Sequence, residues 1–256
     1  MKYSISIFIA TASIVAVLFG FRQSANNSII KKDTTTGVFE PVAVVELFTS
    51  QGCSSCPSAD KLLGKTIQRA NGKKIFALSY HVDYWNRLGW ADPFSSAAFS
   101  NRQNQYVSAL NLNGAYTPQI VVNGNREFVG SDDAALGSAL GNALQERSEV
   151  SFSQIEGTQS DNKVKLTYKL EGNYSDATIN FALVSISETT DIKRGENGGV
   201  RLTNDNVVRQ LITKKANSNG EIFFAATPTP AVGNAAVIVF IQQKDFKIVG
   251  AAMAKM

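Results

Sequence analysis

The run Cys53-Ser54-Ser55-Cys56-Pro57 joins a strand-like stretch to a helix-like stretch and holds the only two cysteines of the chain. The stretch before it, Val42 to Phe48, is almost continuously apolar, which is typical of a strand buried on both faces. The stretch after it has apolar residues at helical spacing and ends near Ala70, and proline suits the first turn of a helix. The pattern predicts a buried strand that leads into a helix with two thiols at its start.

Two thiols at this spacing favour redox chemistry. They can close a disulfide within one helical turn, and the unpaired amides and dipole of a helix N-terminus lower the pKa of a thiol. An isolated C-x-x-C motif is also compatible with an inert structural disulfide or with a reduced pair that only packs. Metal sites usually add a second cysteine pair or a histidine pair, and this chain has a single histidine, His81.

The segment that follows continues an α/β pattern. A second strand is predicted over Lys74 to Tyr80, so strand, helix and strand form a parallel pair with a right-handed crossover. Between Asn86 and Asn113 lies an insertion with a helix that starts at Asp92-Pro93. Two short strands, Gln119 to Val122 and Arg126 to Val129, flank an Asn-Gly-Asn turn and predict a hairpin.

A final helix, capped by Ser131, completes a predicted α/β domain over residues 38–147. From Val150 on, apolar and polar residues alternate, and helical spacing occurs only in a short stretch over Asn206 to Ile212. We therefore expect an all-β, sandwich-like domain over residues 150–256. Its strand candidates are Val164 to Leu170, Ile179 to Leu183, Val237 to Ile241 and Lys247 to Ala251.

The N-terminus has the pattern of an export signal. Lys2 precedes a mostly apolar stretch, Ser4 to Phe21, that ends before Arg22. Residues 1–25 are predicted to be a signal peptide or an N-terminal anchor, with cleavage favoured because no other apolar stretch approaches this length. Residues 26–37 are predicted to be a linker. We expect an extracytoplasmic protein, periplasmic or secreted, in a compartment where disulfides persist.

The order of these elements resembles that of the thioredoxin fold, in which a proline with a cis peptide bond precedes the third core strand and faces the C-x-x-C pair. Tyr116-Thr117-Pro118-Gln119 stands in the matching place. More narrowly, the chain resembles the bacterial secreted family DUF1223, a thioredoxin-like family without a settled function. The blocks that carry this resemblance are Val45 to Cys53, His81 to Trp85, Gly89 to Phe94, Tyr116 to Pro118, Arg194 to Asn197 and Asn206 to Arg209.

The resemblance implies roles for individual residues. Cys53, at the exposed edge of the helix, would be the attacking thiolate, and Cys56, one turn inside, the resolving thiol of a mixed disulfide. Thr117 would offer backbone groups to an extended substrate segment, and the bond to Pro118 is expected to be cis. Glu46 would correspond to the buried acid that assists the resolving thiol in thioredoxins, although it lies one residue further from the first cysteine than in the usual pattern.

His81 and Asp83 follow the second strand, at the carboxyl edge of the sheet where the first cysteine also lies. We expect both near the thiols, where His81 tunes a thiol or completes a metal site with Cys53 and Cys56, unless it is an ordinary packing residue. Arg102 is expected to pair with Asp83. An aromatic cluster in the insertion is expected to form core between insertion and sheet: Tyr84, Trp85, Trp90 and Phe94.

These observations favour an exported thioredoxin-like oxidoreductase that exchanges disulfides with protein thiols or disulfides and needs no cofactor. Two alternatives stay open: a metal-binding protein, for example for copper, that uses Cys53, Cys56 and His81, and a non-enzymatic binding module with a structural disulfide. The formal charge of +4 falls to +2 without Lys2 and Arg22, so nucleic acid is not an expected partner. A membrane would be contacted only through an uncleaved N-terminal segment, and these patterns do not specify an oligomeric state.

Overall fold

The computed structural model describes Met1 and residues 38–160, 163–225 and 228–256. The described residues from Val38 to Met256 form one compact unit. Apart from Met1, the predicted signal peptide or anchor (1–25) and linker (26–37) lie outside the described residues. Within the described part, none of the helices combines the length and apolar character needed to cross a membrane.

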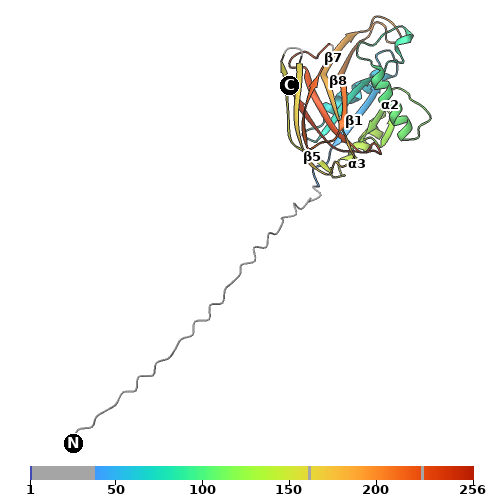
Figure 1. The fold of residues 1–256 in the computed structure, drawn as a ribbon. Coiled ribbons are helices and arrows are strands. Elements are labelled where there is room, and N and C mark those ends of the chain that lie inside the picture. Colours follow the sequence, from blue (N-terminus) through green and yellow to red (C-terminus); the bar gives the residue numbers. More distant parts are fainter. Residues whose placement is uncertain (2–37, 161–162, 226–227) are drawn as a thin grey trace. The chain divides into compact units, whose positions relative to one another are not determined.

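Two sheets make up most of this unit (Figure 1). In the larger sheet the strands lie in the order β11 (Ile248–Lys255), β10 (Ala235–Gln242), β7 (Thr178–Asp191), β8 (Arg201–Lys215), β2 (Ile75–His81), β1 (Ala43–Thr49), β3 (Gln119–Val122) and β4 (Arg126–Val129). The smaller sheet is antiparallel and contains β5 (Val150–Ser160), β6 (Lys163–Gly172) and β9 (Asn219–Phe224). The helices are α1 (Cys56–Gln68), the short 3-10 helix η1 (Asn86–Leu88), α2 (Ala97–Ala109) and α3 (Asp133–Ala143). The fold is therefore mixed α/β.

The predicted strand, helix and strand are confirmed. β1 and β2 are parallel, and their last paired residues, Thr49 and His81, end at the same edge of the sheet. α1 begins at Cys56 behind this edge, with Pro57 in its first turn. The carboxyl ends of two parallel strands and the N-terminus of a helix therefore meet at the cysteines.

The two faces of β1 have different neighbours. Val45 and Leu47 pack with apolar residues of α1 and α3. Val44 and Phe48 point the other way and pack with Tyr106 of α2. This alternation follows from the two-residue repeat of a strand, and it decides which side chains of β1 can reach the cysteine helix.

Two helix starts differ from the predicted ones. α2 begins after Ser96, whose hydroxyl caps it, and not at Asp92-Pro93. The carboxylate of Asp92 is instead bound by other groups in the core. α3 is capped by Asp132 rather than by Ser131, and Asp132 Oδ1 accepts a hydrogen bond from the Ala135 amide at 2.9 Å. An ionised carboxylate is the stronger acceptor for the free amides of a helix start.

The expectation of a separate all-β domain is corrected by the sheet order. β8 pairs in parallel with β2, with Ser79 opposite Val207, and Asn206 Nδ2 donates to the carbonyl of Ala77 at 2.9 Å. The strands of residues 150–256 therefore extend the sheet begun by residues 38–147. The physical reason is that β2 has a second edge, and unpaired strand edges in a core must be satisfied.

The short helix expected over Asn206 to Ile212 is part of β8. Val207 and Val208 are adjacent and both fully buried, so the strand is covered on both faces there and its sequence does not alternate. The predicted strands on either side of this stretch are present as β6, β7, β10 and β11. The smaller sheet packs against one face of β7 and β10 around buried residues such as Leu166, Phe181 and Val237.

Candidate functional site

Cys53 and Cys56 form a disulfide between the end of β1 and the first turn of α1, with their Cα atoms 5.4 Å apart. Ser54 and Ser55 between them are exposed, but both cysteines are fully buried. The expectation that Cys53 lies at an exposed edge is therefore wrong in this state of the protein. Its sulfur contacts the hydroxyl of Ser55 at 3.3 Å.

Thr117 lies against the same sulfur. Its hydroxyl donates to Cys53 Sγ at 3.4 Å and accepts a hydrogen bond from Trp85 Nε1 at 2.8 Å. The bond between Thr117 and Pro118 is cis, as the family resemblance predicts. Trp85, expected only as core, thus orients the threonine hydroxyl toward the disulfide.

A loop of the second half binds the backbone around the disulfide. We call residues 193–199, between β7 and β8, the strap. Asn197 Nδ2 donates to the carbonyls of Gln51 and Cys53, each at 2.9 Å, and Glu196 accepts a hydrogen bond from the Ser54 amide at 3.0 Å. Hydrogen bonding by Ser54 lowers the pKa of Glu196. Sequence reasoning noted this stretch only as part of the family resemblance and gave it no role.

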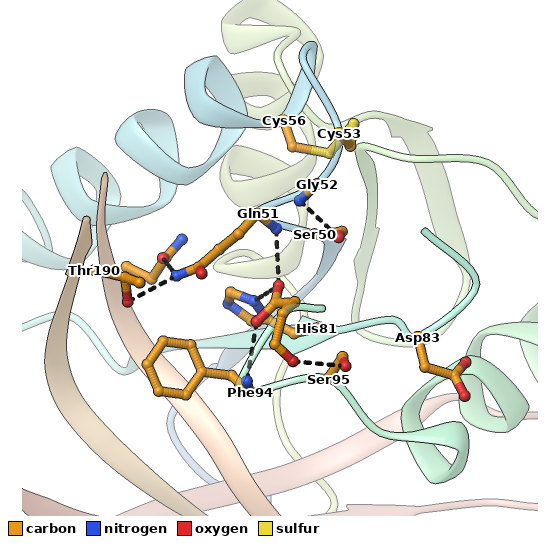
Figure 2. A network of polar contacts seen from close by, with 12 residues as sticks. Ser50, Gln51, Gly52, Cys53, Cys56, His81, Asp83, Phe94, Ser95 and Thr190 are labelled. Atoms are coloured by element: carbon orange, nitrogen blue, oxygen red, sulfur yellow. Dashed lines mark hydrogen bonds and ion pairs between the residues drawn. A yellow bond between two sulfur atoms is a disulfide. The ribbon is translucent and has the colours of Figure 1, made fainter. Parts of the chain in front are cut away.

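His81 forms a buried ion pair below the disulfide (Figure 2). Its Nδ1 lies 2.7 Å from Asp92 Oδ2, which also accepts a hydrogen bond from the Gln51 amide at 2.8 Å. Burial alone would lower the pKa of His81, but the carboxylates of Asp92 and Asp60 outweigh it and raise that pKa. Burial likewise opposes the charge of Asp92, and the His81 charge and hydrogen bonds outweigh it and lower the pKa of Asp92. Each group of the pair thus favours the charged form of the other, and the Asp92 carboxylate is linked to the main chain next to the cysteines.

Gln51 connects this pair to the second half of the chain. Its side-chain Nε2 donates to Thr190 Oγ1 and to Asn204 Oδ1, each at 3.1 Å, and its Oε1 accepts from Trp90 Nε1 at 3.3 Å. Figure 2 shows Gln51 between Thr190 and the turn that carries Gly52 and Cys53. The turn before the disulfide is therefore held from both halves.

The other two predicted auxiliary residues lie elsewhere. Asp83 accepts a hydrogen bond from Ser100 Oγ at 2.6 Å, and Figure 2 shows it turned away from His81. Glu46 lies on the face of β1 opposite α1, where Arg102 Nε donates to it at 2.5 Å and Nη2 at 2.8 Å. The expected Arg102–Asp83 pair is wrong, because the guanidinium lies on the same face of the sheet as Glu46 and both groups are buried there.

Sequence reasoning missed Asp60 on α1, four residues after Cys56. It is 5% exposed, and neither carboxylate oxygen has a hydrogen-bond partner among the described residues. Burial raises the pKa of Asp60 to about 6, against a smaller lowering effect from the charge of His81. The sequence feature that indicates Asp60 is a carboxylate among the apolar positions of the helix, one turn after Cys56.

The predicted metal set is not assembled in this state. Among the described residues, no group of three or more histidine, cysteine, aspartate and glutamate side chains is arranged to hold a metal ion. His81 Nδ1 is bound to Asp92, and the two cysteines are bound to each other.

Comparison with known proteins assigns the chain to a family. A search of curated proteins found no match. A crystal structure of a protein from Agrobacterium tumefaciens is 31% identical with a TM-score of 0.59, over 84% of this chain and 94% of that one. HBP35 of Porphyromonas gingivalis, 14% identical with a TM-score of 0.60 over 86% of this chain and 76% of that one, shows a similar fold only. The family model described as "Protein of unknown function (DUF1223)" matches residues 44–242, and the chain therefore belongs to DUF1223.

Proposed function

We propose that this protein is an exported thiol–disulfide oxidoreductase that acts on protein thiols or disulfides through Cys53 and Cys56. The observation that carries the proposal is the position of the disulfide at the N-terminus of α1, with the Thr117 hydroxyl on the sulfur of Cys53. A thiolate formed there is favoured by the helix N-terminus and by a hydrogen-bond donor aimed at the sulfur.

The order of elements in the first half supports the proposal, because it resembles that of the thioredoxin fold. β1 and β2 are parallel, β3 and β4 form an antiparallel hairpin on the other side of β1, and α1 and α3 pack on one face of these strands. The N-terminal pattern of residues 1–25 supports export, and disulfides persist in exported proteins.

In the proposed reaction the reduced protein attacks a substrate disulfide with the thiolate of Cys53. The Cys53–substrate disulfide forms while the substrate S–S bond breaks, and one substrate thiolate leaves. Cys56 then attacks the sulfur of Cys53, so the intramolecular disulfide forms and the second substrate thiolate leaves. The CSSC pair loses two electrons, the substrate disulfide gains them, and the reverse sequence oxidises a substrate dithiol.

The complete burial of both cysteines favours a second candidate, a binding module whose disulfide is a structural crosslink. In that case the strap and the Thr117 hydroxyl only complete the packing around the crosslink. The two candidates differ in redox potential and in turnover, because structural disulfides resist reduction by cellular thiol pools.

The test compares the parent with Cys53→Ala and Cys56→Ala in reduction of insulin by dithiothreitol. We expect turnover by the parent, none by Cys53→Ala, and mixed disulfides trapped on Cys53 in Cys56→Ala. A redox titration of the parent, read out by alkylation, is run alongside. A potential well below about −300 mV together with absent turnover would favour the structural crosslink.

A further inference from the structure

A buried polar cluster lies beneath the cysteine helix, built from Thr49 of β1, Asp60 of α1, His81 of β2 and Asn204 of β8. Five of its atoms are buried without a hydrogen-bond partner in the described part of the chain: Thr49 Oγ1, Asp60 Oδ1 and Oδ2, His81 Nε2 and Asn204 Nδ2. Unpaired buried polar atoms are rare and costly, and their concentration at one place points to a use. We call these four residues the polar cluster.

The residues of the polar cluster surround the carboxylate of Asp60. The side chains of Thr49 and Asn204 lie near enough to favour its ionised form, although no hydrogen bond of normal geometry joins them to it. The charge of His81 also favours the ionised form. Asp60 therefore has a buried carboxyl group that no hydrogen bond of normal geometry holds in one protonation state.

The helix places Asp60 beside Cys56. Residues four apart on an α-helix are neighbours, with about 5–6 Å between their Cβ atoms. Helical side chains lean toward the N-terminus, so Asp60 leans toward the turn that holds Cys56. Both residues belong to the buried face of α1.

Asp60 also lies at the wall of a cleft. The cleft, of about 510 Å³, runs between α1 and the start of β8, and Asp60 is one of its lining residues although both of its carboxylate oxygens are buried. The charged groups around Asp60 are His81 and Asp92 on the inner side, with Arg209 acting on His81, and Lys61, Lys65, Arg201 and Asp205 along the cleft.

We propose that Asp60 accepts the thiol proton of Cys56 when Cys56 resolves the mixed disulfide, an inference that rests on the proposed function. In this step the S–H bond of Cys56 breaks and an O–H bond forms on Asp60. The sulfur of Cys56 bonds to that of Cys53, and the substrate thiolate leaves with the electron pair of the broken S–S bond. In the oxidising direction Asp60 returns the proton to Cys56.

The geometry gives His81 a positioning role. The positive charge of His81, which Asp92 favours, lowers the pKa of Asp60 and so opposes the effect of burial. The predicted acid, Glu46, cannot take this part, because it lies on the opposite face of β1 in its ion pair with Arg102. The proton acceptor for the resolving thiol thus comes from the cysteine helix itself.

The test follows the reaction of the reduced protein with 5,5′-dithiobis(2-nitrobenzoate) by stopped flow. Attack by Cys53 releases a first thionitrobenzoate, and attack by Cys56 on the resulting mixed disulfide releases a second. We compare the parent, Asp60→Asn and Asp205→Asn between pH 5 and 9. Asp205 is the matched control because it lies beside Gly64, two turns further along α1, or about 12 Å from Cys56 along the axis.

We expect Asp60→Asn to leave the first phase unchanged and to slow the second about 100-fold at neutral pH, within the usual range for loss of a general base. The rise of the second phase with pH, set by Asp60 in the parent, should move in the variant toward the ordinary thiol value of about 8.5. Asp205→Asn should behave as the parent. An unchanged second phase in Asp60→Asn, or equal slowing in both variants, overturns the inference.

Failure of the proposed function would look different. If the reduced parent releases no first thionitrobenzoate, Cys53 is not an exchanging thiol, and both proposals fall. If the parent shows both phases and only the effect of Asp60→Asn is missing, this inference alone falls.

A second measurement does not depend on a variant that folds. The carboxyl carbon of Asp60 is titrated by NMR in the oxidised and the reduced parent. We expect its pKa to differ between the two states, because only the reduced state places a thiol proton beside the carboxylate. The same titration curve in both states overturns the inference.

Discussion

Replacement of Asp60 by asparagine is expected to stabilise the folded protein above pH 6. Burial raises the pKa of the Asp60 carboxyl group to about 6 from its ordinary 3.8. Between these values the folded chain holds a proton that the unfolded chain has released. The stability contributed by the protonated group is therefore complete at low pH and is lost as the pH rises through this window. Asparagine has nearly the same shape and stays uncharged throughout.

The magnitude follows from the width of the window. The two pKa values lie about two units apart, and each unit corresponds to about 1.4 kcal/mol, so the ionised carboxylate costs the fold about 3 kcal/mol above pH 6. Solvent screening reduces this little, because Asp60 is only 5% exposed. In a chain of this size, such a difference corresponds to about 6–12 °C in Tm.

Urea unfolding of the oxidised parent and of Asp60→Asn, followed by tryptophan fluorescence at intervals from pH 4 to pH 8, measures the effect. The two proteins should unfold alike near pH 4 and differ by about 3 kcal/mol at pH 8. The raised pKa of His81 gives stability that is complete below about pH 6.5 and lost as the pH rises further, so the change below pH 6 isolates Asp60. A gap that is constant with pH, or a variant less stable than the parent at pH 8, would refute the reasoning.

Three further substitutions address the surroundings of the disulfide and the core. Thr117→Val removes the hydroxyl that donates to Cys53 and should slow alkylation of the reduced thiol about tenfold near neutral pH, whereas Thr117→Ser should match the parent. Asn197→Ala takes the Asn197 donor from the Gln51 and Cys53 carbonyls, of which Cys53 keeps the Cys56 amide as a donor. It should lower the free energy of unfolding by about 1–3 kcal/mol and speed reduction of the folded protein by dithiothreitol; equal reduction rates would argue that the strap does not limit access. Glu46→Gln leaves the charge of Arg102 buried without a counter-ion and should cost about 3–5 kcal/mol in urea unfolding, with no change in the potential of the disulfide. A changed potential in that variant would contradict the placement of the ion pair away from the cysteines.

The local elements of the first half follow from residue spacing, and for that reason they are predictable. The apolar run before Cys53, the helical spacing after it and the Asn-Gly turn each depend on neighbouring residues only. The pairing of β8 with β2 depends instead on one opposed pair, Ser79 and Val207, and on one side-chain hydrogen bond from Asn206. Contacts so far apart in the chain leave no periodic signal, and so the second half reads as a separate domain.

The site shows the same division between local and long-range information. Cys53 and Thr117 come together because the order of elements determines where they lie. Glu46 cannot reach the cysteine helix because side chains alternate along β1: residues that face α1, such as Val45 and Leu47, alternate with those that face α2. Glu196 and Asn197 reach the backbone around the disulfide only because the strap packs against it, and sequence composition does not specify how a loop packs.

The turn that leads into the disulfide, Gln51 to Ser54, is held mainly by residues of the second half of the chain. Leu62 and Leu63 hold α1 in the apolar core, whereas the segment from Gln51 to Ser54 is held by hydrogen bonds with the strap and with Asn204 of β8. Glu196 and most of the strap are exposed, and segments held by few, exposed hydrogen bonds open at lower free energy than packed elements. Under the proposed function, a protein partner that binds the strap would loosen the turn at Cys53 while the packed body of α1, which carries Asp60, stays in place. In the proposed reaction this would expose the attacking sulfur and leave the proposed proton acceptor on the helix.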